Sequence, residues 1–227
     1  MATVQPFKSP KGILNWVIIT GEGKENMSGK LKYNADLVLP KDSDEAKKLI
    51  DFIDEYWLAN LPTGFNPKRA PKSTGYRDEM IAVLDKDGEK QYGEDGKVVK
   101  EATGNVVFTF STDTTYPSGD PKKVIVFNAK GNKVDLGSKK IGNQSEGRIS
   151  GAVGVYTVKD PKGKTITDAG TTLYLNSVML TKFVEFSGEE QWDADEDGDG
   201  WTGEGETEDF NGEPGQDVGS SKGAPRL

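Results

Sequence analysis

The sequence of 227 residues contains neither cysteine nor histidine. Without cysteine there can be no disulfide bond, no thiolate nucleophile and no zinc–thiolate site. Without histidine the chain lacks the only side chain whose unperturbed pKa lies near neutrality, and with it the usual general base of enzymes. We therefore expect no enzymatic activity, no metal site and no other cofactor, although carboxylate and lysine chemistry stay open in principle.

Long apolar runs are also absent. The longest, such as residues 16–19 and 80–84, are far shorter than a membrane span. The first twenty residues lack the charged start and apolar centre of a signal peptide. The sequence therefore predicts a soluble protein of the cell interior.

Charge is distributed very unevenly along the chain. Residues 188–227 hold thirteen of the 37 acidic residues and two of the 29 basic ones, a net charge of −11. Residues 1–187 are left with a net charge of +3. The first part is large enough to bury the core of one domain, whereas the second is too polar to fold. We therefore expect one folded domain over residues 1–187 and a disordered acidic tail over 188–227.

The folded part is predicted to be mostly β. Residues 30–39 alternate apolar and polar side chains, the pattern of a half-buried strand. Further strands are expected at 13–20, 80–84, 105–110, 123–128, 147–158 and 171–186. Residues 60–79 are predicted to be a long exposed loop, and 85–104 a polar excursion. Six or more short strands with one helix predict a closed or nearly closed antiparallel β-barrel.

The helix is expected at about residues 43–59. Asp42 or Ser43 can cap it, and the acidic residues 44 and 45 fall where the helix dipole favours negative charge. Apolar residues recur at helical spacing from Ala46 to Trp57. We expect this apolar stripe to close one side of the β core.

The acidic segment carries two candidate functions. Asp193, Asp195, Asp197 and Glu204 match the spacing of an EF-hand calcium loop, but neither flank resembles a helix, and we do not predict a dedicated metal site. The second hypothesis is a tail that competes with external polyanions for the basic domain and offers anchors to a partner protein. The residues expected to serve this tail function are Trp192, Asp193, Asp195, Asp197, Trp201 and Phe210.

Basic and aromatic residues cluster in the predicted domain. Cations neutralise phosphates, and aromatic faces stack on unpaired bases, so this combination is typical of single-stranded nucleic-acid binding. The residues predicted to contact phosphate are Lys30, Lys32, Lys68, Arg69, Lys72, Arg77, Lys122 and Lys123. Tyr33, Phe65 and Tyr76 are predicted to stack on bases or to line the groove.

Three segments resemble, in the same order, the single-stranded DNA-binding proteins of T7-type and related bacteriophages. They are KYNADLVLPKDS (32–43), VIVFNAKGNKVD (124–135) and LNSVMLTKFVEFSGEEQWDADED (175–197). The resemblance implies an OB-fold Greek-key barrel with the helix inserted after an early strand. It also implies binding of single-stranded DNA in the cytoplasm of the infected host cell, a tail that recruits phage DNA polymerase or other replication proteins, and dimers in some members.

Two other functions stay open from the sequence. The chain could be a phage structural β module with an acidic extension, which would be found in virus particles and would not bind DNA. It could also be a calcium-binding β domain, which calorimetry would reveal.

In the family that the chain resembles, tails often end in acids and an aromatic residue, whereas this sequence ends in SSKGAPRL.

Overall fold

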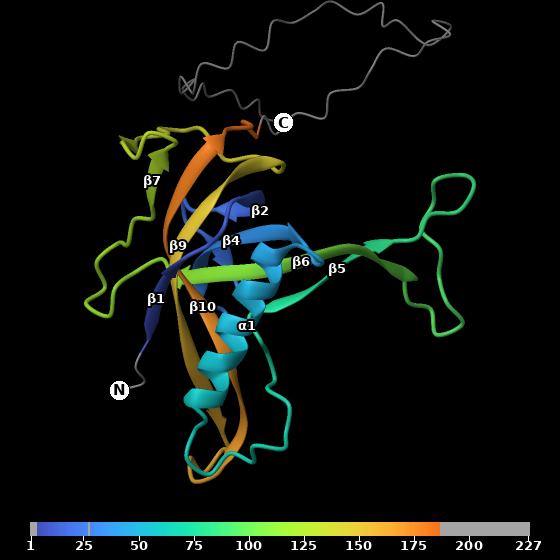
Figure 1. Ribbon diagram of the computed structural model, residues 1–227, viewed down its shortest axis with the longest axis vertical. Helices are drawn as coiled ribbons and strands as arrows, with labels where there is room; N and C mark the ends of the chain where they lie inside the picture. The colour runs from blue at the N-terminus through green and yellow to red at the C-terminus, as the bar shows by residue number, and fades with distance from the viewer. Residues whose placement is uncertain (1–3, 27, 187–227) are drawn as a thin grey trace, which may run out of the picture. The chain divides into compact units, whose positions relative to one another are not determined.

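The computed structural model describes residues 4–26 and 28–186. These ranges form ten strands and one helix (Figure 1). The elements are β1 (Gln5–Lys8), β2 (Gly12–Ile18), β3 (Lys24–Glu25), β4 (Leu31–Pro40), α1 (Asp44–Ala59), β5 (Tyr76–Ala82), β6 (Lys100–Asp113), β7 (Ile125–Asn128), β8 (Lys133–Val134), β9 (Ser145–Lys159) and β10 (Ile166–Lys182).

Five of these strands close into a barrel. Their order is β9-β2-β4-β6-β10, and β10 pairs with β9 to complete the circle. All neighbours are antiparallel except β6 and β10, which are parallel. A five-stranded closed barrel with one inserted helix is the OB-fold. The predicted fold class is therefore confirmed, with one parallel pair that the alternation pattern did not reveal.

Alternating side chains of the barrel strands fill its interior. Leu37, Phe108, Phe110 and Leu175 are fully buried in one cluster. Burial of each such side chain contributes about 1.5–3 kcal/mol. Every buried residue of this cluster lies between Leu14 and Leu180. A chain that ends at residue 186 thus keeps the whole core and should fold by itself.

The helix α1 begins and packs as predicted. The Ser43 hydroxyl accepts a hydrogen bond from the backbone N–H of Ala46 at 3.1 Å, which satisfies one free donor of the first turn. Ala46, Leu49 and Ile53 are buried in the same cluster as the barrel side chains. The helix therefore extends the barrel core, and its apolar stripe has the role expected from the sequence.

The structure differs from the sequence prediction between residues 60 and 104. The exposed loop predicted for 60–79 ends earlier, because β5 begins at Tyr76. The polar excursion 85–104 belongs to an arm that projects from the barrel and consists of the end of β5, the start of β6 and the residues between them (Figure 1). Its outer part consists of two small hairpins turned at Gly88 and Gly96, both with positive φ. Strands β1, β3 and β8 have only two to four residues, too few to show an alternation.

No helix among the described residues is long and apolar enough to cross a membrane. The predicted acidic tail, 188–227, lies outside the described residues, as do the tail residues and the EF-hand-like pattern named above. The division of the chain at residue 187 stays a prediction.

Candidate nucleic-acid interface

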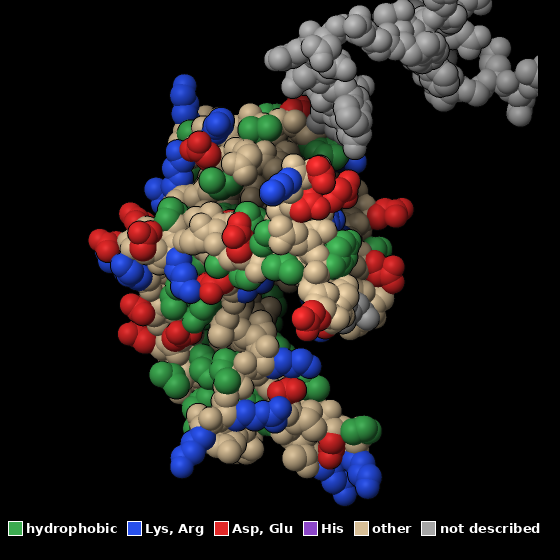
Figure 2. All heavy atoms as spheres, turned by 90° about the vertical axis from the view of Figure 1, so that its right-hand side faces the viewer, with side chains coloured by type: hydrophobic (Ala, Val, Ile, Leu, Met, Phe, Trp, Pro, Cys, Tyr) green, Lys and Arg blue, Asp and Glu red, His purple; other side chains and the backbone are tan. Residues whose placement is uncertain are grey.

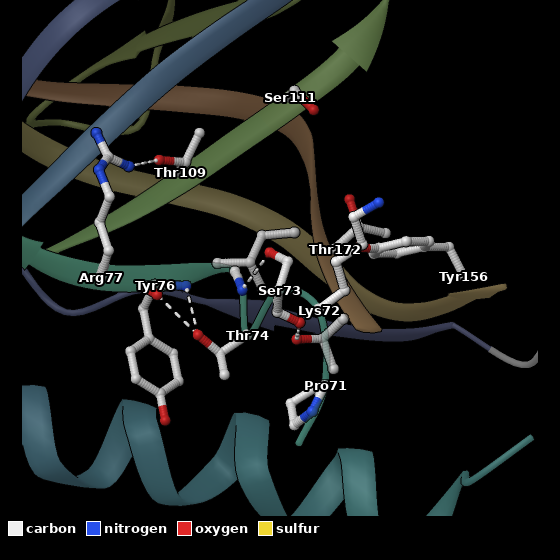
Figure 3. Close-up of a pocket in the computed structure, with 13 residues that line it drawn as sticks. Pro71, Lys72, Ser73, Thr74, Tyr76, Arg77, Thr109, Ser111, Tyr156 and Thr172 are labelled. Carbon is white, nitrogen blue, oxygen red and sulfur yellow. Dashed lines mark hydrogen bonds between the residues drawn. The ribbon is translucent and has the colours of Figure 1, made fainter. Parts of the chain in front are cut away.

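A groove lies on the outer face of strands β4 and β6. It consists of two adjoining hollows of about 570 and 710 Å³, which share Arg77, Thr109 and Ser111. We call the pair the central groove. Figure 3 shows the first hollow, with Arg77 and Thr109 on one side and Tyr156 and Thr172 on the other. The second hollow continues from Arg77 to the segment that connects β2 with β4.

The floor of the central groove is polar. In the antiparallel pair β4–β6, Asn34 lies opposite Ser111, and Asp36 lies opposite Thr109. Side chains alternate across a strand, so the intervening Phe110 points into the core while these four point outward. The floor therefore offers hydroxyl, amide and carboxylate groups that can form hydrogen bonds.

Arg77 reaches the centre of the groove because the segment before it is held between two strands. The carbonyl of Ser73 accepts a hydrogen bond from Thr171 N–H at 2.8 Å, and the carbonyl of Gly75 accepts one from Thr109 N–H at 3.0 Å. Gly75 has a φ of +82°, and a Cβ there would come within 2.9 Å of a β10 side chain. This position thus requires glycine.

The guanidinium of Arg77 is paired but accessible. One nitrogen, Nη2, lies 3.1 Å from Oδ2 of Asp36, and Nη1 donates to the hydroxyl of Thr109. The Asp36 side chain is only 9% exposed, whereas that of Arg77 is 59% exposed. Arg77 can therefore contact a phosphate with its free face while the buried carboxylate fixes its position.

The other cations of the groove form weaker ion pairs. Lys32 lies 3.3 Å from Asp113, and Lys72 lies 3.9 Å from Asp168. Lys24 has no ion pair within the described ranges. Exposed ion pairs contribute at most about 1 kcal/mol, so an incoming phosphate can replace these partners at little cost.

Two aromatic side chains lie at opposite ends of the groove. Trp16 lines the second hollow, and its side chain is 65% exposed. Tyr156 lines the first hollow and is half-buried. Burial, and next the charge of Asp168, raise the pKa of Tyr156, so its hydroxyl stays neutral at physiological pH.

The backbone around Trp16 explains why so large an apolar ring faces solvent. The register of β2 shifts between Asn15 and Ile18, and Trp16 has a φ of +52°, which is rare for a residue with a side chain. Its N–H donates to Oδ1 of Asn143 at 2.8 Å, and its carbonyl accepts from the Asn34 amide at 2.9 Å. These contacts hold a strained bulge that turns the indole outward, and such strain is often found at functional sites.

Basic and acidic side chains are mixed over the face of the molecule seen in Figure 2. Figure 2 shows them interspersed on the face that it presents, with lysine and arginine more frequent at its lower end. That end carries the α1–β5 segment and the β9–β10 turn (Figure 1). The interface is thus a groove with local cations, and this face is not uniformly positive.

The structure brings together four of the eleven predicted DNA-binding residues in the central groove. These are Lys32, Lys72, Tyr76 and Arg77. Lys30 and Lys68 are exposed outside it, and Arg69 pairs with Asp168 at 3.0 Å. The remaining residues are Tyr33, Phe65, Lys122 and Lys123, of which Tyr33 and the two lysines line a different cleft.

Of the three aromatic residues predicted to stack on bases or to line the groove, Tyr76 lines it, while the rings of all three lie against the protein. Tyr33 is 8% exposed because its strand turns it toward the core. Phe65 is 7% exposed and packs edge-on against Trp57 of α1. The ring of Tyr76 points away from the hollow toward α1 (Figure 3), where its hydroxyl donates to Asp54. Burial, followed by this hydrogen bond, raises the Tyr76 pKa.

Sequence reasoning missed Trp16 and Tyr156. The bulge in β2 breaks the two-residue period, so the sequence of residues 13–20 did not show that Trp16 faces outward. Tyr156 was hidden within the strand predicted at 147–158. Pairing of β9 with β10 places it opposite Gly170, on the outward side. Only the fold could reveal that both residues border the same groove.

Among the described residues, no group of three or more acidic side chains is arranged to hold a metal ion. The groove carboxylates are Asp36, which faces Arg77, and Glu25. The described residues therefore offer hydrogen bonding, phosphate contact and an exposed indole as the chemistry of the groove.

No family model and no curated protein sequence matches the chain. Among solved structures, the chain is similar to gp2.5, a single-stranded DNA-binding protein encoded by bacteriophage T7. The TM-score is 0.50 at 17% identity over 86% of this chain and 93% of that one. It is also similar to the single-stranded DNA-binding protein of bacteriophage Enc34 in complex with ssDNA, with a TM-score of 0.46 at 20% identity, over 78% and 86% of the two chains. The chain thus has the fold of the T7 protein.

Proposed function

We propose that the protein binds single-stranded DNA along the central groove and coats and protects it during the replication and recombination of a bacteriophage. The observation that carries this proposal is the pair of adjoining hollows, with an exposed Trp16 in one, Lys72 in the other and Arg77 shared by both. OB-folds bind oligonucleotides on this face of the barrel. The T7 protein with the same fold is described as binding single-stranded DNA, which supports the proposal.

The groove suits single strands better than duplexes. Stacking on Trp16 or Tyr156 needs unpaired bases, because a duplex hides their faces. The cations Lys24, Lys32, Lys72 and Arg77 would contact the backbone phosphates. The role is that of a binding protein with no catalytic step, in the cytoplasm of the infected cell.

The acidic segment 188–227 has a regulatory role in this proposal. Its charge of −11 would compete with DNA for the cations of the domain, at the high effective concentration of a tethered ligand. It would also recruit phage DNA polymerase or other replication proteins through its aromatic anchors. The resemblance of this segment to phage single-stranded DNA-binding proteins supports this part of the proposal.

Fluorescence polarisation of labelled oligo-dT and of a matched duplex tests the proposal. The measurement uses the full chain and a chain that ends at residue 186, over a salt series. We expect a preference for oligo-dT and a slope of log K against log salt of roughly −3 for four phosphate contacts. We also expect tighter binding without the acidic segment. Equal affinity for the duplex, or no binding, would contradict a single-strand function, and unchanged affinity after truncation would contradict competition.

A further inference from the structure

A second cleft lies under the hairpin of β7 and β8. It consists of two adjoining hollows of about 580 and 430 Å³, which share Val126, Val134 and Leu136. We call it the β7–β8 cleft. None of the residues that line it lines the central groove. The cleft is therefore a separate surface of the same barrel.

Lysine residues surround this cleft. Lys122, Lys123, Lys130 and Lys133 line it, and Asp135 is its one acidic residue. Within residues 4–26 and 28–186, none of these four lysines forms an ion pair. Lys122 is held by a hydrogen bond to the Thr112 hydroxyl and lies over the Tyr116 ring. The charges of the other three lysines are available to an acidic ligand, as is that of Lys24 in the central groove.

The apolar part of the cleft combines aliphatic side chains with the aromatic rings of Phe127 and Phe183, and much of it is accessible. Ile125, Val134 and Phe183 are 41%, 37% and 39% exposed, and Leu136 is partly buried beside them. Aliphatic side chains accept apolar side chains of a partner well, whereas nucleic-acid bases prefer flat aromatic rings. The aliphatic share of the lining, Ile125, Val126, Val134 and Leu136, therefore suits a peptide.

The backbone of strand β8 also favours a peptide ligand. Strand β8 is the last in the sheet order, and among the described residues its outer edge pairs with no strand. An open edge can accept an extended peptide through main-chain hydrogen bonds, with alternate side chains in neighbouring pockets. We propose that the β7–β8 cleft binds an extended acidic peptide of a partner protein, with apolar side chains alternating with Asp or Glu.

The acidic segment of this chain has that pattern over four residues only, Trp192–Asp195. Its aromatic residues Trp192, Trp201 and Phe210 are nine residues apart, with several glycines between them. Glycine is unfavourable in strands, and such spacing does not give the two-residue period of an added strand. We therefore expect the peptide that binds in the cleft to belong to another protein.

Polarisation with a synthetic peptide tests the proposal. The probe is a fluorescein-labelled peptide that alternates Glu or Asp with Val or Ile, and the control probe has Lys at each acidic position. We expect saturable binding of the acidic probe to the full chain and none of the control. The variant Lys130→Glu/Lys133→Glu should weaken binding at least about tenfold. The matched control Lys86→Glu/Lys90→Glu, on the exposed arm, should not.

Two further measurements test whether DNA or the protein's own acidic segment occupies the cleft instead. Saturating oligo-dT should leave peptide binding unchanged; displacement of the peptide would make the cleft part of the nucleic-acid path and overturn the proposal. The chain that ends at residue 186 should bind the probe as tightly as the full chain. Much tighter binding to the shorter chain would show that the protein's own acidic segment occupies the cleft. The peptide titration is read without DNA, so it can fail or succeed independently of the proposed function.

Discussion

The central groove and the β7–β8 cleft are two basic surfaces of one barrel, and they differ in how their cations are held. In the groove, Arg77 and Lys32 pair with carboxylates, and the floor is polar. In the cleft, the four lysines form no ion pair among the described residues, although Lys122 donates to the Thr112 hydroxyl, and the lining is apolar, with aliphatic side chains beside Phe127 and Phe183. A paired cation keeps a fixed position, whereas an unpaired lysine adapts to its ligand.

This difference indicates two kinds of ligand. A nucleic-acid backbone presents phosphates at regular spacing, which fixed cations and hydroxyl groups can match. A short peptide offers main-chain hydrogen bonds and individual side chains, which an open strand edge and flexible lysines can match. Counting basic residues alone would not separate these two surfaces.

Of all the substitutions considered, charge reversal should produce the largest difference in oligo-dT affinity between a groove variant and a cleft variant. Lys24→Glu/Lys72→Glu places two repulsive charges at opposite ends of the groove, on exposed side chains. We expect it to weaken oligo-dT binding roughly tenfold to a hundredfold and to make the salt dependence shallower. Lys130→Glu/Lys133→Glu in the cleft should change oligo-dT affinity by less than about threefold. Equal losses from both variants, measured by polarisation, would merge the two surfaces into one DNA path.

Aromatic truncation is the next test. Trp16→Ala should weaken oligo-dT binding by about 1–3 kcal/mol if one base stacks on the indole. The matched change in the cleft, Phe183→Ala, should leave oligo-dT affinity unchanged, and thermal melting should confirm that both variants are folded. If Trp16→Ala binds as the parent does, base stacking at this end of the groove is wrong.

The sequence predicted the fold better than the site. Alternation over 30–39 and helical spacing over 43–59 located β4 and α1 closely, because both patterns are local. Because basic and aromatic residues cluster in residues 60–79, the sequence correctly indicated that Lys72 and Arg77 lie beside a groove. It also selected Phe65, which is buried, since a sequence pattern does not show what a loop packs against.

What the sequence did not show depends on contacts between distant segments, and the DNA-binding role of Lys122 and Lys123 stays a prediction. Lys122 and Lys123 belong to the cleft because β10 lies between β7 and β6 in the sheet. The groove floor depends on the register of β4 against β6, about seventy-five residues apart in the chain. Trp16 depends on a bulge held by two asparagine side chains, one of which is Asn143. None of these is a periodic signal in the sequence.

The smallest change in oligo-dT affinity is expected from a substitution of Asp36, the carboxylate that pairs with Arg77 in the groove. In Asp36→Asn the amide can still accept a hydrogen bond from Arg77, but the competing negative charge is removed. Charged hydrogen bonds are about twice as strong as neutral ones, so the guanidinium should become more available to phosphate. We expect oligo-dT to bind about three- to tenfold more tightly, a gain of about 0.7–1.4 kcal/mol.

The matched control for this change is Asp113→Asn. Asp113 pairs with Lys32 but its side chain is 60% exposed, so solvent already screens its charge and the gain in affinity should be smaller. Thermal melting of each variant separates affinity from stability. If Asp36→Asn binds oligo-dT no better than the parent, Arg77 does not contact phosphate. The ion pair at the centre of the groove would then be structural, and the contrast with the unpaired lysines of the cleft would lose its functional meaning.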